Sequence, residues 1–186
     1  MNIGFALCGS FCTLDKVFPV METLTKAHTV IPIFSGAVCT IDSRFGTAQS
    51  HWQKATDLCG RPPLSTIPEV EPIGPKKLLD ALVIAPCTGN TLAKLAHSIA
   101  DGPVTMAAKS HLRNGRPILL AISTNDALAG AAENLGKLLG RKHYYFVPFG
   151  QDDAIAKPCS MVADFAMIPQ ALEFAMEGKQ IAPLLL

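Results

Sequence analysis

The chain has 186 residues, a length that suits one domain and suffices for a hydrophobic core. Hydrophobic residues make up 49% and charged residues 17%, and this composition excludes an intrinsically disordered protein. Sixteen Lys and Arg residues against 15 Asp and Glu residues give a net charge of +1, which argues against a nucleic-acid or anionic-membrane binder because such proteins carry a basic surplus.

Short apolar runs alternate along the chain with amphipathic segments. The apolar runs predict β-strands at residues 3–7, 29–34, 81–85, 118–122 and 144–147. The amphipathic segments predict helices at residues 15–27, 42–58, 91–100, 104–112 and 127–139. Asp126 is expected to cap the last of these helices, with Leu128 on its inward face.

Two segments are expected to be less regular. Residues 60–75 contain five prolines, which predict a surface loop with one short edge strand near residues 65–67. Residues 160–177 are periodic but contain Pro169, which predicts a kink or two helices.

The alternation of all-apolar strands with helices predicts an α/β fold. Such strands form a parallel sheet that is covered on both faces, and right-handed crossovers then give a doubly wound, Rossmann-like, three-layer α/β/α sandwich. We expect residues 1–186 to form a single domain, with the C-terminal helical segment 160–186 packed on it. Ligands of such sheets bind at the carboxyl ends of the strands.

The turns after four of these strands are small and polar, and they begin at Gly9, Ser35, Cys87 and Ser123. Free N–H groups and hydroxyls at helix N-termini suit a phosphate group. Each turn taken alone is better explained by ordinary capping and turn formation. Their convergence on one edge of the sheet favours a ligand site.

The sequence lacks the motifs of two common phosphate-binding sites. A dinucleotide site needs G-x-G-x-x-G after the first strand and an acid after the second, but here Gly9 is followed by Ser10-Phe11-Cys12 and the second strand ends at Phe34-Ser35. A GK[ST] phosphate loop is missing as well. A mononucleotide site therefore remains, for which FMN is the usual occupant.

The run from Ala85 to Ala96, APCTGNTLAKLA, continues into Ser98-Ile99-Ala100-Asp101. It resembles the signature A-P-x-[ST]-[AG]-N-T-[IL]-A-K-x-A of the flavoprotein family that includes the cysteine-peptide and phosphopantothenoylcysteine decarboxylases. The resemblance covers about residues 3 to 150. It implies an FMN site formed by Gly9, Ser10, Phe11, Ser35, Cys87, Thr88, Asn90, Thr91, Ser123, Thr124 and Asn125.

The chain departs from the decarboxylases of this family at two places. Their catalytic histidine is missing, because no histidine lies between His51 and His97. Ser123-Thr124 replaces the Glu-Met of their E-M-N segment. These departures predict that the chain is not a decarboxylase, and they leave its catalytic residues unknown.

Residues 4–12 and 68–75 are similar to one branch of the family, which forms half of a two-component oxidoreductase in sporulating bacteria. That resemblance implies cytoplasmic oxidation of a dihydropyridine dicarboxylate to an aromatic pyridine dicarboxylate, a dehydrogenase-like partner subunit that carries NAD(P), and homo-oligomerisation. An FMN-dependent decarboxylase-like flavoprotein and a non-catalytic assembly subunit with a vestigial flavin site stay open as alternatives.

The remaining charged and sulfur-containing residues give weaker predictions. A dianionic substrate needs cationic partners, and the candidates flank the proline-rich segment: Arg44, Arg61, Lys76 and Lys77. His97 and His111 are expected on exposed helix faces. The six cysteines include no CxxC pair, so we expect reduced thiols and no metal site.

Overall fold

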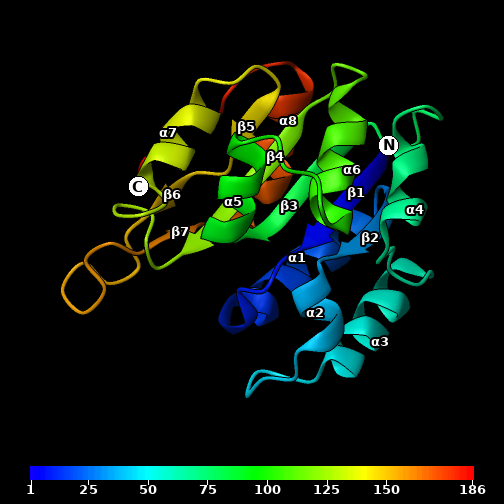
Figure 1. The fold of residues 1–186 in the computed structure, drawn as a ribbon, viewed down its shortest axis with the longest axis horizontal. Coiled ribbons are helices and arrows are strands. Elements are labelled where there is room, and N and C mark those ends of the chain that lie inside the picture. Colours follow the sequence, from blue (N-terminus) through cyan, green and yellow to red (C-terminus); the bar gives the residue numbers. More distant parts are fainter.

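A sheet of seven strands runs through the computed structural model, which describes residues 1–186 (Figure 1). Five of the strands are parallel and have the order β2-β1-β3-β4-β5. Their bounds are β1 Asn2–Leu7, β2 Thr29–Phe34, β3 Ala81–Cys87, β4 Ile118–Thr124 and β5 Tyr144–Phe146. The direction of winding reverses between β1 and β3, which is where doubly wound sheets of this order bind their ligands.

Two short strands, β6 Phe149–Gly150 and β7 Met161–Ala163, extend the sheet with antiparallel pairing. One side of β4 pairs with β5 along Ile118–Leu120 and with β7 at Ser123 and Thr124. The predicted parallel, doubly wound core is confirmed, and the antiparallel extension was not anticipated. Strands of two or three residues are too short to show a period in the sequence.

Helices cover both faces of the sheet, so the expected three layers are present (Figure 1). On one face α1 packs on α8, and on the other α5 packs between α6 and α7. The helices are α1 Leu14–Thr25, α2 Gly36–Thr40, α3 Ala48–Cys59, α4 Ile67–Val70, α5 Gly89–Ala96, α6 Pro103–Leu112, α7 Ala132–Leu139 and α8 Ile168–Met176. None of them is long and apolar enough to cross a bilayer.

The core lies along the central strands, and every residue of β3 is buried because helices cover both of its faces. Gly4 in β1 is needed for this packing. A Cβ atom there would lie 2.5 Å from Leu79 Cδ1 and 2.9 Å from Leu82 Cδ1, so any larger residue would displace core side chains.

The proline-rich segment differs from the surface loop that the sequence predicted. Pro68 lies in the first turn of α4, where a proline is tolerated because that N–H group has no helical partner. Val70 and the adjacent Ile73 are buried in the core. The expected strand at residues 65–67 is absent, and the pairing there is a single bridge from Leu64 to Ile33.

Several helix boundaries also differ from the prediction. The segment 42–58 becomes α3 only from Ala48, because Thr47 caps it by accepting a hydrogen bond from the Ser50 N–H group at 3.0 Å. The helix expected to end at residue 100 stops at Ala96, and Ile99 is 47% exposed.

Asp126 does not cap α7. It accepts a hydrogen bond from the Thr124 hydroxyl instead, so residues 127–131 form turns and Leu128 is half exposed. Pro169 lies in the first turn of α8 and produces no kink there. His111 is fully buried rather than exposed, because α6 turns that side chain toward Pro117, whose carbonyl oxygen lies 3.1 Å from Nε2.

Candidate functional site

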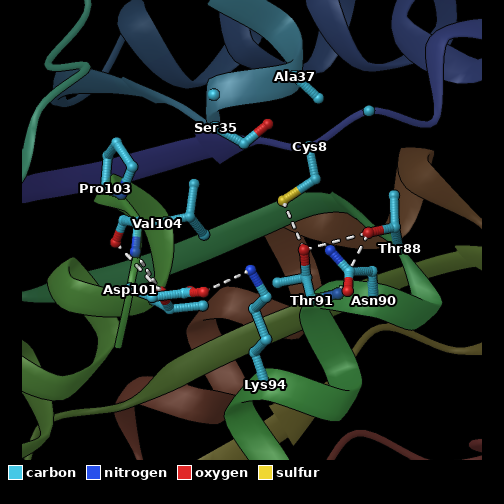
Figure 2. Close-up of a pocket in the computed structure, with 14 residues that line it drawn as sticks. Cys8, Ser35, Ala37, Thr88, Asn90, Thr91, Lys94, Asp101, Pro103 and Val104 are labelled. Atoms are coloured by element: carbon cyan, nitrogen blue, oxygen red, sulfur yellow. Dashed lines mark hydrogen bonds and ion pairs between the residues drawn. The ribbon is translucent and has the colours of Figure 1, made fainter. Parts of the chain in front are cut away.

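The turns after β1, β2 and β3 surround a hollow of about 530 Å³ at the reversal between β1 and β3 (Figure 2). We call it the switch-point hollow. Five of the residues predicted from the sequence line it, namely Gly9, Ser35, Thr88, Asn90 and Thr91. The carboxyl ends of parallel strands share one edge of the sheet, and this is why residues about 80 positions apart in the chain meet here.

The first turn of α5 forms the floor of this hollow. Thr88 is the N-cap, and its hydroxyl accepts a hydrogen bond from the Thr91 N–H group at 3.3 Å. The Thr91 hydroxyl in turn donates to Cys8 Sγ at 3.3 Å (Figure 2). These bonds fix the end of the helix at which N–H groups are free and the dipole is positive, which is the end that attracts an anion.

Two glycines keep backbone close to this site. A Cβ atom at Gly89 would lie 2.7 Å from Thr124 Oγ1 and 2.8 Å from Asp126 Oδ1, so the turns after β3 and β4 touch there. A Cβ atom at Gly36 would meet nothing within 4 Å, so the start of α2 is open. Gly36, which lines the switch-point hollow, therefore offers backbone to a ligand rather than a bulky side chain.

One ion pair lies on the wall of the switch-point hollow. Lys94 Nζ of α5 is 3.0 Å from Asp101 Oδ2, in the turn before α6 (Figure 2). These two residues were not among those predicted to form the site, although both belong to the matched signature. Cys8 was also missed, and burial raises the pKa of its thiol to about 11, so it stays neutral beside the ligand space.

A second hollow of about 390 Å³ adjoins the first, and Gly9 and Thr88 line both. Four further predicted residues line it: Ser10, Ser123, Thr124 and Asn125. Two lysines that the sequence analysis missed, Lys16 and Lys157, line it as well, so we call it the lysine hollow. No pattern in the sequence marked them, because they come from α1 and from the connection between β6 and β7.

Two predicted site residues line neither hollow. Cys87 is the last residue of β3 and is fully buried, and this burial raises the pKa of its thiol well above the ordinary value. Phe11 is half-buried and stacks on His51, with 6.3 Å between the ring centroids. Both residues support the turns instead of facing the ligand space.

The four cations predicted for a dicarboxylate also lie outside both hollows. Arg44 lies over its neighbour Phe45, 4.8 Å from the ring centroid. Arg61, Lys76 and Lys77 are exposed on the segment between α3 and β3. Closeness along the chain to the proline-rich segment was a poor guide, because no residue of 60–77 lines either hollow.

The switch-point hollow fits FMN in three respects. Its volume lies within the roughly 300–1,000 Å³ of ordinary cofactor sites. The N-terminus of α5 and the Ser35 hydroxyl are neutral donors suited to one phosphate group. Asn90 adds an amide that suits the hydroxyls of a ribityl chain.

Comparisons with known proteins bear on the same region. Residues 1–144 match the family model described as "Flavoprotein". The chain is 45% identical over 185 residues to the B subunit of dipicolinate synthase from Bacillus subtilis (strain 168), covering 99% of this chain and 92% of that protein.

Solved structures give the same result. The crystal structure of the B subunit of dipicolinate synthase from Bacillus halodurans C superimposes with a TM-score of 0.91 at 41% identity, covering 100% of this chain and 95% of that one. An FMN-dependent cysteine decarboxylase superimposes with a TM-score of 0.71 at 22% identity, covering 94% and 97%, and this second likeness shows a shared fold alone.

Proposed function

The chain belongs to the flavoprotein family, and on this premise we propose that it binds FMN in the switch-point hollow and acts as the B subunit of a dipicolinate synthase. The observation that carries the proposal is the convergence of Gly9, Ser35 and Thr88 on one hollow at the reversal of the sheet. The names of the relatives from the two Bacillus species supply the reaction.

Different residues of the switch-point hollow bind different parts of FMN. The N-terminus of α5, capped by Thr88, holds the phosphate together with Ser35. Asn90 orients the ribityl chain, and the ring faces the adjoining lysine hollow, which Ser123 to Asn125 line. FMN, when bound, supplies a two-electron acceptor for hydride.

The reaction is the oxidation of dihydrodipicolinate to dipicolinate, which belongs to sporulation and takes place in the cytoplasm. The dihydropyridine ring loses a hydride and a proton and becomes aromatic. The hydride acceptor would be supplied by FMN, held on this chain by Ser35, Thr88 and Asn90, or by NAD(P)⁺ on the dehydrogenase-like A subunit of dipicolinate synthase, the partner of this chain. The chain also forms homo-oligomers, as the names of structurally similar dodecameric and cage-forming flavoproteins suggest.

The residues around the hollows favour oxidation over decarboxylation. No histidine lines either hollow, so the general acid of the related decarboxylases has no counterpart there. This supports the oxidoreductase over the decarboxylase-like alternative.

The test uses the full chain with and without its dehydrogenase-like partner. Titration with FMN should quench flavin fluorescence, and Asn90→Ala should weaken binding about tenfold through the loss of an orienting hydrogen bond. The two proteins together with NAD(P)⁺ and dihydrodipicolinate should form dipicolinate faster than the partner alone. If this chain changes neither the rate nor the product, the proposal is wrong. If the chain raises the rate without binding FMN, the cofactor assignment is wrong and the chain is a non-catalytic assembly subunit of the enzyme.

A further inference from the structure

We propose that the lysine hollow binds the two carboxylates of the substrate, with Lys16 and Lys157 as the cations that recognise a dianion. The inference rests on the proposed function for the identity of the dicarboxylate. It assigns that substrate to a hollow separate from the one proposed for FMN.

The position of the lysine hollow suits a substrate. Gly9 and Thr88 line both hollows, so the two hollows adjoin at these residues. A hydride donor must be adjacent to its acceptor, so a substrate that reduces FMN needs a site next to the switch-point hollow. The lysine hollow is next to it, because Gly9 and Thr88 are shared by the two.

Lys16 is a cation without a partner. It forms none of the ion pairs found in the structure. It also stands in the first turn of α1, where the positive end of the helix dipole disfavours a cation. A bound carboxylate would compensate for both the missing partner and the unfavourable helix position.

Lys157 is held in place by Asp152, whose Oδ2 lies 2.9 Å from Nζ. An ammonium group has three donors, so two remain for a ligand. The connection that carries Lys157 is ordered by a side-chain carboxylate, because Asp153 Oδ1 accepts hydrogen bonds from the backbone N–H groups of Ile155 and Ala156. The antiparallel pair β6 and β7 brings this connection to the carboxyl end of β4.

The lining charges leave the hollow positive. Lys16 and Lys157 contribute two positive charges and Asp152 one negative charge, which gives a sum of +1. The Ser10 and Ser123 hydroxyls, which line the same hollow, lie 2.8 Å apart. Only one of their two protons can lie between the oxygens, so the other is free to donate to a carboxylate. Two cations and a neutral donor match a dicarboxylate better than a monocarboxylate.

The test measures binding to the full chain directly by isothermal titration calorimetry, with FMN present. Pyridine-2,6-dicarboxylate should bind, and pyridine-2-carboxylate should bind about tenfold more weakly because it lacks the second charge. Lys16→Gln and Lys157→Gln should each weaken dicarboxylate binding about tenfold. Lys76→Gln, an exposed lysine away from both hollows, is the matched control and should change nothing.

Each outcome decides the matter. Lys16→Gln should not lower the melting temperature, so loss of binding in that variant cannot be ascribed to unfolding. Absence of dicarboxylate binding to the wild-type chain, or unchanged affinity in the two lysine variants, overturns the inference. Flavin fluorescence of the same samples distinguishes the two proposals. If FMN binds but dicarboxylate affinity does not depend on the two lysines, only the dicarboxylate site is wrong. If FMN does not bind, the cofactor assignment is wrong.

Discussion

The Ser10 and Ser123 hydroxyls lie 2.8 Å apart, although 113 positions separate them in the chain and β3 lies between their strands in the sheet. The bond joins the turn after β1 to the end of β4. Ser123 is nearly buried, and its backbone is held by antiparallel pairing with Val162 of β7. The serine pair therefore ties the floor of the lysine hollow to the antiparallel extension of the sheet.

The hydrogen bond between Ser10 and Ser123 should be measurable as a coupling energy between substitutions at these two positions. We expect Ser10→Ala and Ser123→Ala each to lower the free energy of unfolding, and the double variant to lower it by about 1 kcal/mol less than the sum, because the shared hydrogen bond can be lost only once. Urea unfolding of the wild type, the two single variants and the double variant gives the four free energies that this double-mutant cycle needs. Strict additivity would mean that the two hydroxyls do not stabilise each other.

The Thr88 cap should serve both stability and binding. Thr88→Ala is expected to lower the free energy of unfolding by about 1 kcal/mol, because the first turn of α5 loses its side-chain acceptor. FMN binding, measured by quenching of flavin fluorescence, should weaken in the same variant, whereas Thr88→Ser should retain both properties.

Thr47 provides the matched control for this variant. It caps α3 in the same way, accepting from the Ser50 N–H group at 3.0 Å, but lines neither hollow. Thr47→Ala should cost similar stability and leave FMN affinity unchanged. Equal loss of FMN affinity in both variants would show that general destabilisation, and not the site, is responsible.

The sequence predicts the centre of this fold well and its margins poorly. The strand at residues 81–85 and the turn at Thr88 follow from an apolar run and a dense motif, and both are local features. Lys157 could not be placed, because its position depends on two very short strands whose pairing partners are distant in the chain. The helix start at Ala132 was missed because Asp126, a good capping residue, bonds to Thr124 instead. Local propensity cannot reveal such a competing tertiary contact.

Gly89 should be intolerant of any side chain. In Gly89→Ala the added Cβ atom would lie 2.7 Å from Thr124 Oγ1 and 2.8 Å from Asp126 Oδ1, so these two side chains must move and their hydrogen bond is disturbed. We expect a lower melting temperature and weaker FMN binding. Gly136→Ala in α7 is the control, because a Cβ atom there meets nothing within 4 Å and should stabilise the helix by up to about 1 kcal/mol. A melting temperature of Gly89→Ala equal to that of the wild type would contradict the close approach.

His111 should make stability fall in mild acid. Burial lowers its pKa from 6.5 to about 4, and Nδ1 has no hydrogen-bond partner in the core. Because the unfolded chain takes up a proton near pH 6.5 and the folded chain does not, this contribution to stability is complete above pH 6.5. It is lost as the pH falls toward 4, by about 3 kcal/mol in all.

Urea unfolding at several values between pH 4 and pH 7.5 measures this loss. His111→Gln cannot titrate, so its stability should vary less steeply with pH than that of the wild type, even if the variant is less stable throughout. His97→Gln is the control, because His97 is exposed at the end of α5 and its imidazole ring hydrogen-bonds to the Asn134 side chain. If the His111 variant keeps the full slope, then another group, and not this buried imidazole, couples folding to the proton.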